Sequence, residues 1–202
     1  MLGFSRISLV VVFCGVAFLM APPAAQANPP EIRLIDVNGT TVTTLSFHGQ
    51  NGSVTIQNVA IGGFIVSLEG HAHLRPSGVL QLTATITGGG PTERLTILLT
   101  NTNYPQTGLS TFAENVTGTI TGPGSVTFGA FLDQNDQPFA IAQSTNHLSL
   151  LGPYPPAPPD APISGSDATT VTDTTTYSMT SQTTIIGGDV NFTFTVTNTP
   201  SN

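Results

Sequence analysis

Alternation of apolar and hydroxyl side chains is the feature that most limits how this chain folds. It is clearest over residues 81–87, where Leu82, Ala84 and Ile86 alternate with threonines. Successive side chains of a β-strand point to opposite faces of the sheet, so this segment is predicted to be a strand with one buried and one solvent-facing side. Threonine favours the same structure because its branched Cβ suits a pleated strand better than a helix.

Eleven further segments show this pattern, and glycine, asparagine and proline turns separate them. They are residues 32–36, 42–47, 53–59, 64–69, 94–100, 110–120, 125–132, 139–145, 169–176, 178–186 and 191–198. No segment competes as an amphipathic helix. The sequence therefore predicts an all-β fold, an antiparallel two-sheet β-sandwich of about eleven or twelve short strands.

Residues 1–27 have the pattern of a secretory signal peptide. Arg6 precedes an apolar run at 7–20, and the small-residue motif ending at Ala27 predicts cleavage before Asn28. A membrane anchor is the alternative, but the run is shorter than the roughly 20 residues that span a bilayer, and Pro22 and Pro23 end it. We therefore expect a protein secreted to the periplasm or cell exterior, with no membrane anchor in the mature chain.

Composition limits what the exported chain can bind. Its only cysteine, Cys14, lies in the signal, so no disulfide is expected. Lysine is absent, and the exported chain has three arginines, Arg33, Arg75 and Arg94, against eleven carboxylates, which gives a net charge of about −8. With Arg6 of the signal included, the full chain has a net charge of −7. Nucleic acids and anionic membranes both require clustered cations, so neither is an expected partner.

Residues 152–162 are rich in proline and cannot form a regular sheet strand. An inter-domain linker is one interpretation, but the segment beyond it offers only three predicted strands and little core of its own. We therefore predict a long loop within a single domain spanning residues 28–202. A proline-rich ligand for a partner is a further alternative.

Several short segments resemble, in the same order, secreted bacterial proteins that carry a PEP-CTERM sorting signal. These segments are residues 61–64, 95–104, 131–139, 151–154 and 177–180. The resemblance implies an exported, β-rich surface or matrix component without assigned chemistry. The sequence ends at 197–202 without the Pro-Glu-Pro motif, apolar helix and basic tail of that signal, so free secretion is expected.

A metal site is the sharpest chemical hypothesis. Glu69, His71 and His73 are two residues apart, so on a strand they share one face, and a His-x-His pair suits zinc or iron. A further ligand would come from another strand, with His147, His48 or Glu114 as candidates. The alternative is a polar, solvent-facing strand end.

A second oxygen-rich group lies at 133–136. Asp133, Asn135 and Asp136 are candidate Ca²⁺ ligands, although the segment lacks the glycine and the closing glutamate of an EF-hand. The alternative is an acidic turn between strands. No cofactor is otherwise expected.

Catalysis has little support, because the chain lacks a Gly-x-Ser-x-Gly motif and the exported part lacks cysteine. Sugar binding usually needs exposed aromatic rings, yet there is no Trp and only three Tyr, and Phe128, Phe192 and Phe194 are expected in the core. We therefore predict a non-enzymatic exported β-sandwich of the cell surface or extracellular matrix, which contacts itself or polysaccharide. The alternative is a metal- or carbohydrate-binding module that uses residues 69–73 or 133–136.

Overall fold

The computed structural model describes residues 28–38, 41–50, 52–74, 77–155 and 161–201. The predicted signal peptide lies outside these ranges. They contain thirteen β-strands and no helix long and apolar enough to cross a membrane. The strands are β1 (Glu31–Asn38), β2 (Thr41–His48), β3 (Ser53–Ile61), β4 (Phe64–His73), β5 (Gly78–Gly88), β6 (Arg94–Tyr104), β7 (Gly108–Thr121), β8 (Ser125–Asp133), β9 (Asn146–His147), β10 (Leu151–Tyr154), β11 (Ala161–Asp173), β12 (Tyr177–Ile186) and β13 (Asp189–Pro200).

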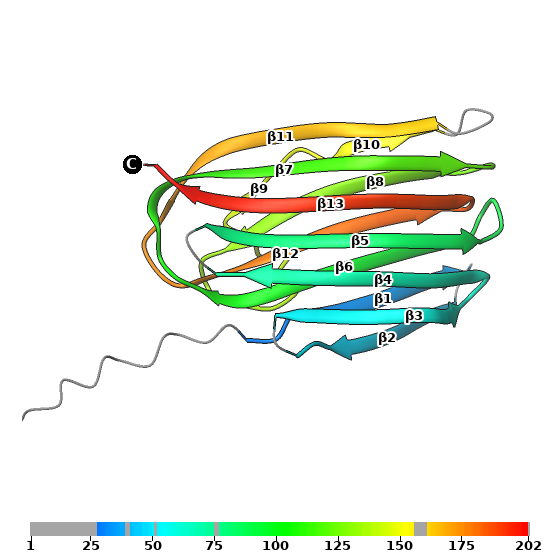
Figure 1. Ribbon diagram of the computed structural model, residues 1–202, viewed down its shortest axis with the longest axis horizontal. Helices are drawn as coiled ribbons and strands as arrows, with labels where there is room; N and C mark the ends of the chain where they lie inside the picture. The colour runs from blue at the N-terminus through cyan, green and yellow to red at the C-terminus, as the bar shows by residue number, and fades with distance from the viewer. Residues whose placement is uncertain (1–27, 39–40, 51, 75–76, 156–160, 202) are drawn as a thin grey trace, which may run out of the picture.

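These strands form two antiparallel sheets that pack face to face (Figure 1), which confirms the predicted sandwich. The seven-stranded sheet has the order β10-β8-β12-β6-β1-β2, with β9 paired to β8. The six-stranded sheet has the order β11-β7-β13-β5-β4-β3. Many neighbouring strands are therefore far apart in sequence.

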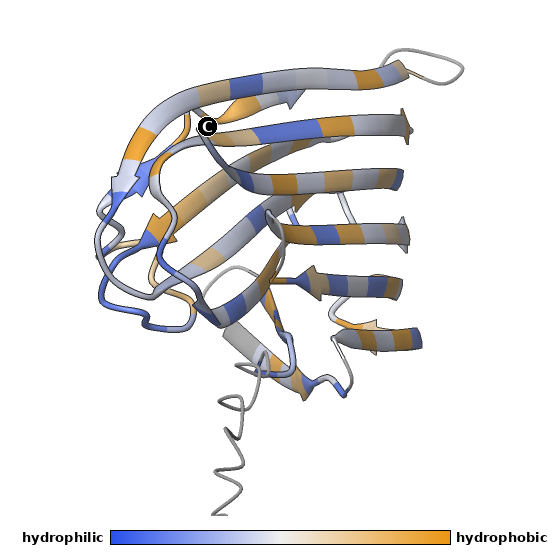
Figure 2. Cartoon of the chain, turned by 60° about the vertical axis from the view of Figure 1, so that its left-hand side comes forward, coloured by the Kyte–Doolittle hydropathy of each residue, from blue (hydrophilic) through white to orange (hydrophobic). Residues whose placement is uncertain are grey.

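The period-two pattern corresponds to the observed burial. On β5, Leu82, Ala84 and Ile86 are buried, whereas Thr83 and Thr85 are exposed. Hydrophobic and hydrophilic positions alternate along the strands in the same way (Figure 2). Each sheet thus has an apolar inner face and an outer face rich in hydroxyl groups.

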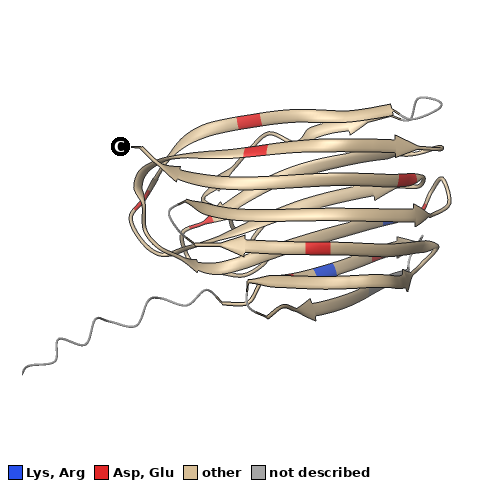
Figure 3. Ribbon diagram, viewed as in Figure 1, with Lys and Arg blue, Asp and Glu red and all other residues tan. Residues whose placement is uncertain are grey.

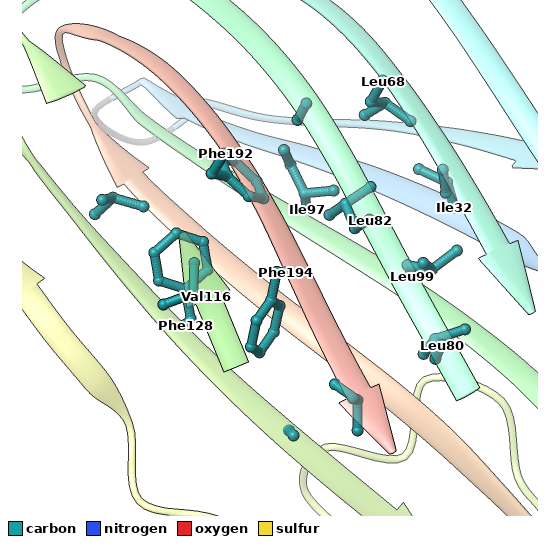
Figure 4. Packing of buried hydrophobic residues seen from close by; sticks show 14 of the residues in the cluster. Ile32, Leu68, Leu80, Leu82, Ile97, Leu99, Val116, Phe128, Phe192 and Phe194 are labelled. Carbon is teal, nitrogen blue, oxygen red and sulfur yellow. The ribbon is translucent and has the colours of Figure 1, made fainter. Parts of the chain in front are cut away.

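Aromatic side chains occupy the middle of the core, as predicted. The Phe128 ring on β8 lies 4.9 Å from the Phe192 ring and 5.2 Å from the Phe194 ring, centroid to centroid. These contacts join the two sheets, since β8 and β13 belong to different ones (Figure 4). Strands on both sides of the proline-rich segment contribute to this one cluster of buried residues.

The prediction of a strand at residues 139–145 is wrong. This segment forms turns, and Phe139 has a backbone φ of +58°, which interrupts an extended strand. It packs on the outer face of the seven-stranded sheet, where the Arg33 guanidinium lies 4.0 Å from the centre of the Phe139 ring. The Phe139 N–H donates to Thr100 Oγ1 (3.3 Å). Its apolar residues cover a sheet face instead of joining a sheet.

The prediction that residues 152–162 form a loop is also wrong in part, because both ends of this segment lie in strands. Pro153 lies in β10, which pairs with β8, and Pro162 lies in β11, which pairs with β7 along its whole length. Both are edge strands, where proline is tolerated because one side of the strand needs no backbone donor. Residues 156–160 lie outside the described ranges.

Candidate functional site

The strand that carries the predicted metal ligands presents them as expected. Glu69, His71 and His73 alternate with buried residues on β4 and lie on the outer face of the six-stranded sheet. Glu69 Oε1 lies 3.1 Å from His71 Nε2. The predicted sharing of one face is therefore confirmed, and the first two side chains are in contact.

The further ligands do not join them. His147 is on β9 and His48 on β2, both in the opposite sheet, and Glu114 points into the core from β7. The outer faces of two packed sheets point in opposite directions, so these groups cannot meet at β4. Within the described ranges, no group of three His, Cys, Asp or Glu residues is placed to hold a metal ion.

The acidic segment after β8 is organised by its own hydrogen bonds. Asp133 is buried, and its Oδ1 accepts from the Asn135 backbone N–H (3.3 Å) and from Asn135 Nδ2 (3.1 Å). Its Oδ2 accepts from the Gln137 N–H (3.1 Å). These oxygens close a tight turn, as in the alternative interpretation from the sequence.

Asp136 ties this turn to a neighbouring strand end. Its Oδ1 accepts from the Asn103 N–H (2.7 Å), and both residues have positive φ. Burial raises the pKa of Asp136, and nearby Asp133 raises it further, although the Asn103 hydrogen bond opposes this. Asp133 and Asp136 thus serve as acceptors for backbone N–H groups at this end of the sandwich, and the Asn135 side chain donates to Asp133.

A buried carboxylate that the sequence analysis did not single out lies at the same end. Asp173, the last residue of β11, is fully buried. Its Oδ2 accepts hydrogen bonds from Thr107 Oγ1 (2.7 Å), Ser110 Oγ (3.1 Å) and Asn198 Nδ2. Asp173 thereby links β11 to β13 and to the start of β7.

Two tyrosines line the interior next to this carboxylate. Tyr104 and Tyr177 are fully buried and stacked, with ring centroids 5.3 Å apart. Burial raises the pKa of Tyr177 to about 12, and the adjacent Asp173 adds to the rise, whereas the neighbouring Asn198 side chain opposes it. These rings are core residues and offer no exposed platform for a sugar.

A second pair of carboxyl groups lies where β7 and β11 run together. Glu114 is 2 % exposed, and neither carboxyl oxygen has a hydrogen-bond partner within the described residues. Asp167 is its cross-strand neighbour, and acidic positions on the two strands lie side by side (Figure 3). Burial, with a contribution from Asp167, raises the pKa of Glu114 to about 8. The core therefore holds a group that exchanges a proton near neutral pH.

A shallow groove of about 220 Å³ lies beside Glu69 on the outer face of the six-stranded sheet. It sits over the β-bulge in β3, where Asn58 has a φ of +52° and its N–H donates to Ser67 Oγ (3.0 Å). Its polar lining consists of Thr55, Gln57, Ser67, Glu69, Thr83 and Thr85. The groove therefore presents hydroxyl, amide and carboxylate groups together.

The buried carboxyl groups had a signal in the sequence. Glu114 lies two residues from Phe112 and from Val116, and Asp173 lies two residues from Val171. Residues two apart on a strand share a face, so both carboxyl groups are expected on the inner face with these apolar residues. Their partners come from distant strands and were not visible in the pattern. A scan against protein-family models found no match to this chain, and a search of curated proteins found none.

Proposed function

We propose that this chain is an exported, non-enzymatic β-sandwich of the cell surface or extracellular matrix that acts through contacts of its sheet surfaces. The main support is the outer face of the six-stranded sheet. There, Thr83 Oγ1 lies 3.3 Å from Thr193 Oγ1, and Gln81 Nε2 donates to Thr195 Oγ1 (3.2 Å). Such a face donates and accepts hydrogen bonds over a broad area, which suits a structural or binding role.

The hydrogen bonds of the buried and partly buried aspartates support the same proposal. Asp133, Asp136 and Asp173 use carboxylate oxygens to hold turns and strand ends. Their hydrogen bonds stabilise the loop end of the sandwich, which is a structural role. The predicted signal at 1–27 and the absence of lysine from the sequence agree with an exported surface protein.

Expression of the full chain in a Gram-negative host tests the export. We expect the periplasm or medium to contain a product that begins at Asn28, identified by intact mass, because the cleavage motif ends at Ala27. Ala27→Arg, which places a large cation at the cleavage position, should leave the signal attached. A cytoplasmic protein of full mass from the unchanged sequence would contradict the proposal.

The groove beside Glu69 favours carbohydrate binding as a second candidate. A carboxylate flanked by threonine hydroxyls and a glutamine amide can accept and donate hydrogen bonds to sugar hydroxyls. A single such site without a stacking aromatic ring would bind weakly, and two such sites joined in one assembly would bind a repeating polysaccharide with higher apparent affinity.

Co-sedimentation with insoluble polysaccharides such as cellulose, chitin and peptidoglycan tests this candidate. We expect Glu69→Gln to reduce the bound fraction several-fold, because charged acceptors make the stronger hydrogen bonds. Glu31→Gln, at a carboxylate that lies 3.5 Å from His48 on the opposite sheet, serves as the matched control because Glu69 likewise lies beside a histidine. Equal binding by the two variants would exclude the groove.

A further inference from the structure

The outer side of β2 is an unpaired strand edge within the described part of the chain. β2 pairs with β1 alone, with Phe47 opposite Ile32. In antiparallel pairs, opposite residues alternate between those that exchange backbone hydrogen bonds and those that do not. The Gly49 N–H donates to the Pro30 carbonyl (2.8 Å), so this pair, which continues the same register, is of the bonded kind.

The register then decides which backbone groups point away from β1. Every second residue from Gly49 bonds to β1, so residues 42, 44, 46 and 48 direct their N–H and C=O groups outward. Gln50 follows the same phase, since its N–H donates to the Ser53 carbonyl (2.8 Å) and not to β1. β2 thus presents a regular row of donors and acceptors along its free edge.

The other three sheet edges carry features that oppose strand addition. β3 has a bulge at Asn58. β10 is only four residues long and contains Pro153. On β11, the Tyr154 hydroxyl donates to the Ser164 carbonyl (3.3 Å), and Asp167 Oδ2 accepts from the Ser149 N–H (3.0 Å). Bulges, proline, short strands and covering contacts are the usual protections of an edge.

β2 has none of these features. Residues 41–48 include no proline and no Lys, Arg, Asp or Glu, although the whole chain has a net charge of −7. Leu45 and Phe47 are only partly buried against the core. Phe47 and Val54 also line a groove of about 460 Å³ between β2 and β3. The edge therefore has no carboxylate, lysine or arginine, and it is apolar on its inner side. Its one ionisable side chain is His48, which lies 3.5 Å from Glu31 Oε1 on β1.

We propose that β2 pairs antiparallel with β2 of a second copy of this chain, around a two-fold axis at Ser46. In this register, outward-bonding residues meet outward-bonding residues, and Leu45 lies opposite the partner's Phe47. The two apolar pairs that result extend the core across the junction, and one sheet continues through the dimer. This inference rests on the proposed interaction role, for which it names the partner.

Sedimentation velocity of the exported protein over a concentration series tests the proposal. A single strand pair buries less than the roughly 1,200 Å² of a standard interface, so we expect a dimer with a micromolar dissociation constant. Ser46→Pro removes one outward N–H without breaking a β1–β2 hydrogen bond and should make the protein monomeric. Ser46→Ala keeps the backbone donor and should still dimerise.

A second variant separates loss of pairing from loss of folding. Ser46→Asp places two like charges opposite each other at the axis and should raise the dissociation constant at least tenfold, with an unchanged circular dichroism spectrum and melting temperature at low concentration. A monomer at every concentration of the unchanged protein would overturn the proposal and leave the export proposal intact. Dimers of both folded Ser46→Pro and Ser46→Asp would overturn it too.

Discussion

Glu114→Gln is expected to stabilise the protein by about 2 to 4 kcal/mol at pH 8 and to have little effect at pH 5. Glu114 is 2 % exposed, and its pKa is raised from 4.5 to about 8. The folded protein therefore keeps a proton that the unfolded chain releases between these values. The unfolded state binds fewer protons there, so the unfolding free energy contributed by Glu114 falls as pH rises through this window. The glutamine amide does not ionise in this pH range, so its contribution to the unfolding free energy does not change with pH.

Urea unfolding at pH 5, 6, 7 and 8 measures this effect. The unchanged protein should lose stability steadily over this range, and Glu114→Gln should remove most of that loss. Burial also raises the pKa values of Asp36 and Asp136, but both residues are present in both proteins, so the difference between the two curves isolates Glu114. Glu69→Gln, at an exposed carboxylate, should follow the unchanged protein. Parallel curves for Glu114→Gln would show that Glu114 is ionised in the folded state.

Asp173→Ala is expected to destabilise the protein by about 3 to 5 kcal/mol. The substitution removes the acceptor of three donors, Thr107 Oγ1, Ser110 Oγ and Asn198 Nδ2. Ser110 and Asn198 are fully buried, so water cannot replace the lost acceptor without opening this end of the sandwich. The cost therefore exceeds that of the missing volume.

Denaturant unfolding of Asp173→Ala beside Val171→Ala separates these two contributions. Val171 lies two residues earlier on the inner face of β11 and is also buried, so its truncation removes volume but no hydrogen bond. About 2 kcal/mol is expected for that change. Asp173→Asn keeps one acceptor and should fall between the two alanine variants. An Asp173→Ala cost no larger than that of Val171→Ala would mean that the donors find other partners.

Much of the fold was predictable because strand phase is local. Leu82 and Thr83 point to opposite faces wherever their strand lies in the sheet. The same alternation predicts a strand at each of twelve segments. The strand prediction for residues 139–145 was wrong because a short apolar run is equally compatible with a loop that packs on a sheet face. Only the contacts of Phe139 with Thr100 and Arg33 distinguish the two structures. The prediction of a loop throughout residues 152–162 was wrong at Pro153 and Pro162 for a related reason. Proline fits an edge strand, and the sequence does not show which strands are edges.

Local sequence pattern was sufficient to predict the fold class, the inner and outer face of most strands, and the shared face of Glu69, His71 and His73. It did not show that His147 belongs to the opposite sheet or that Glu114 lies beside Asp167. Nor did it show that β2 has a free edge within the described residues, which follows from the order of strands in the sheet. The difference lies in the range of the interactions. The direction of a side chain follows from a period of two along its own strand. The neighbour of a strand follows from pairing between segments up to 120 residues apart, as for Gly78 and Asn198, which no local pattern encodes.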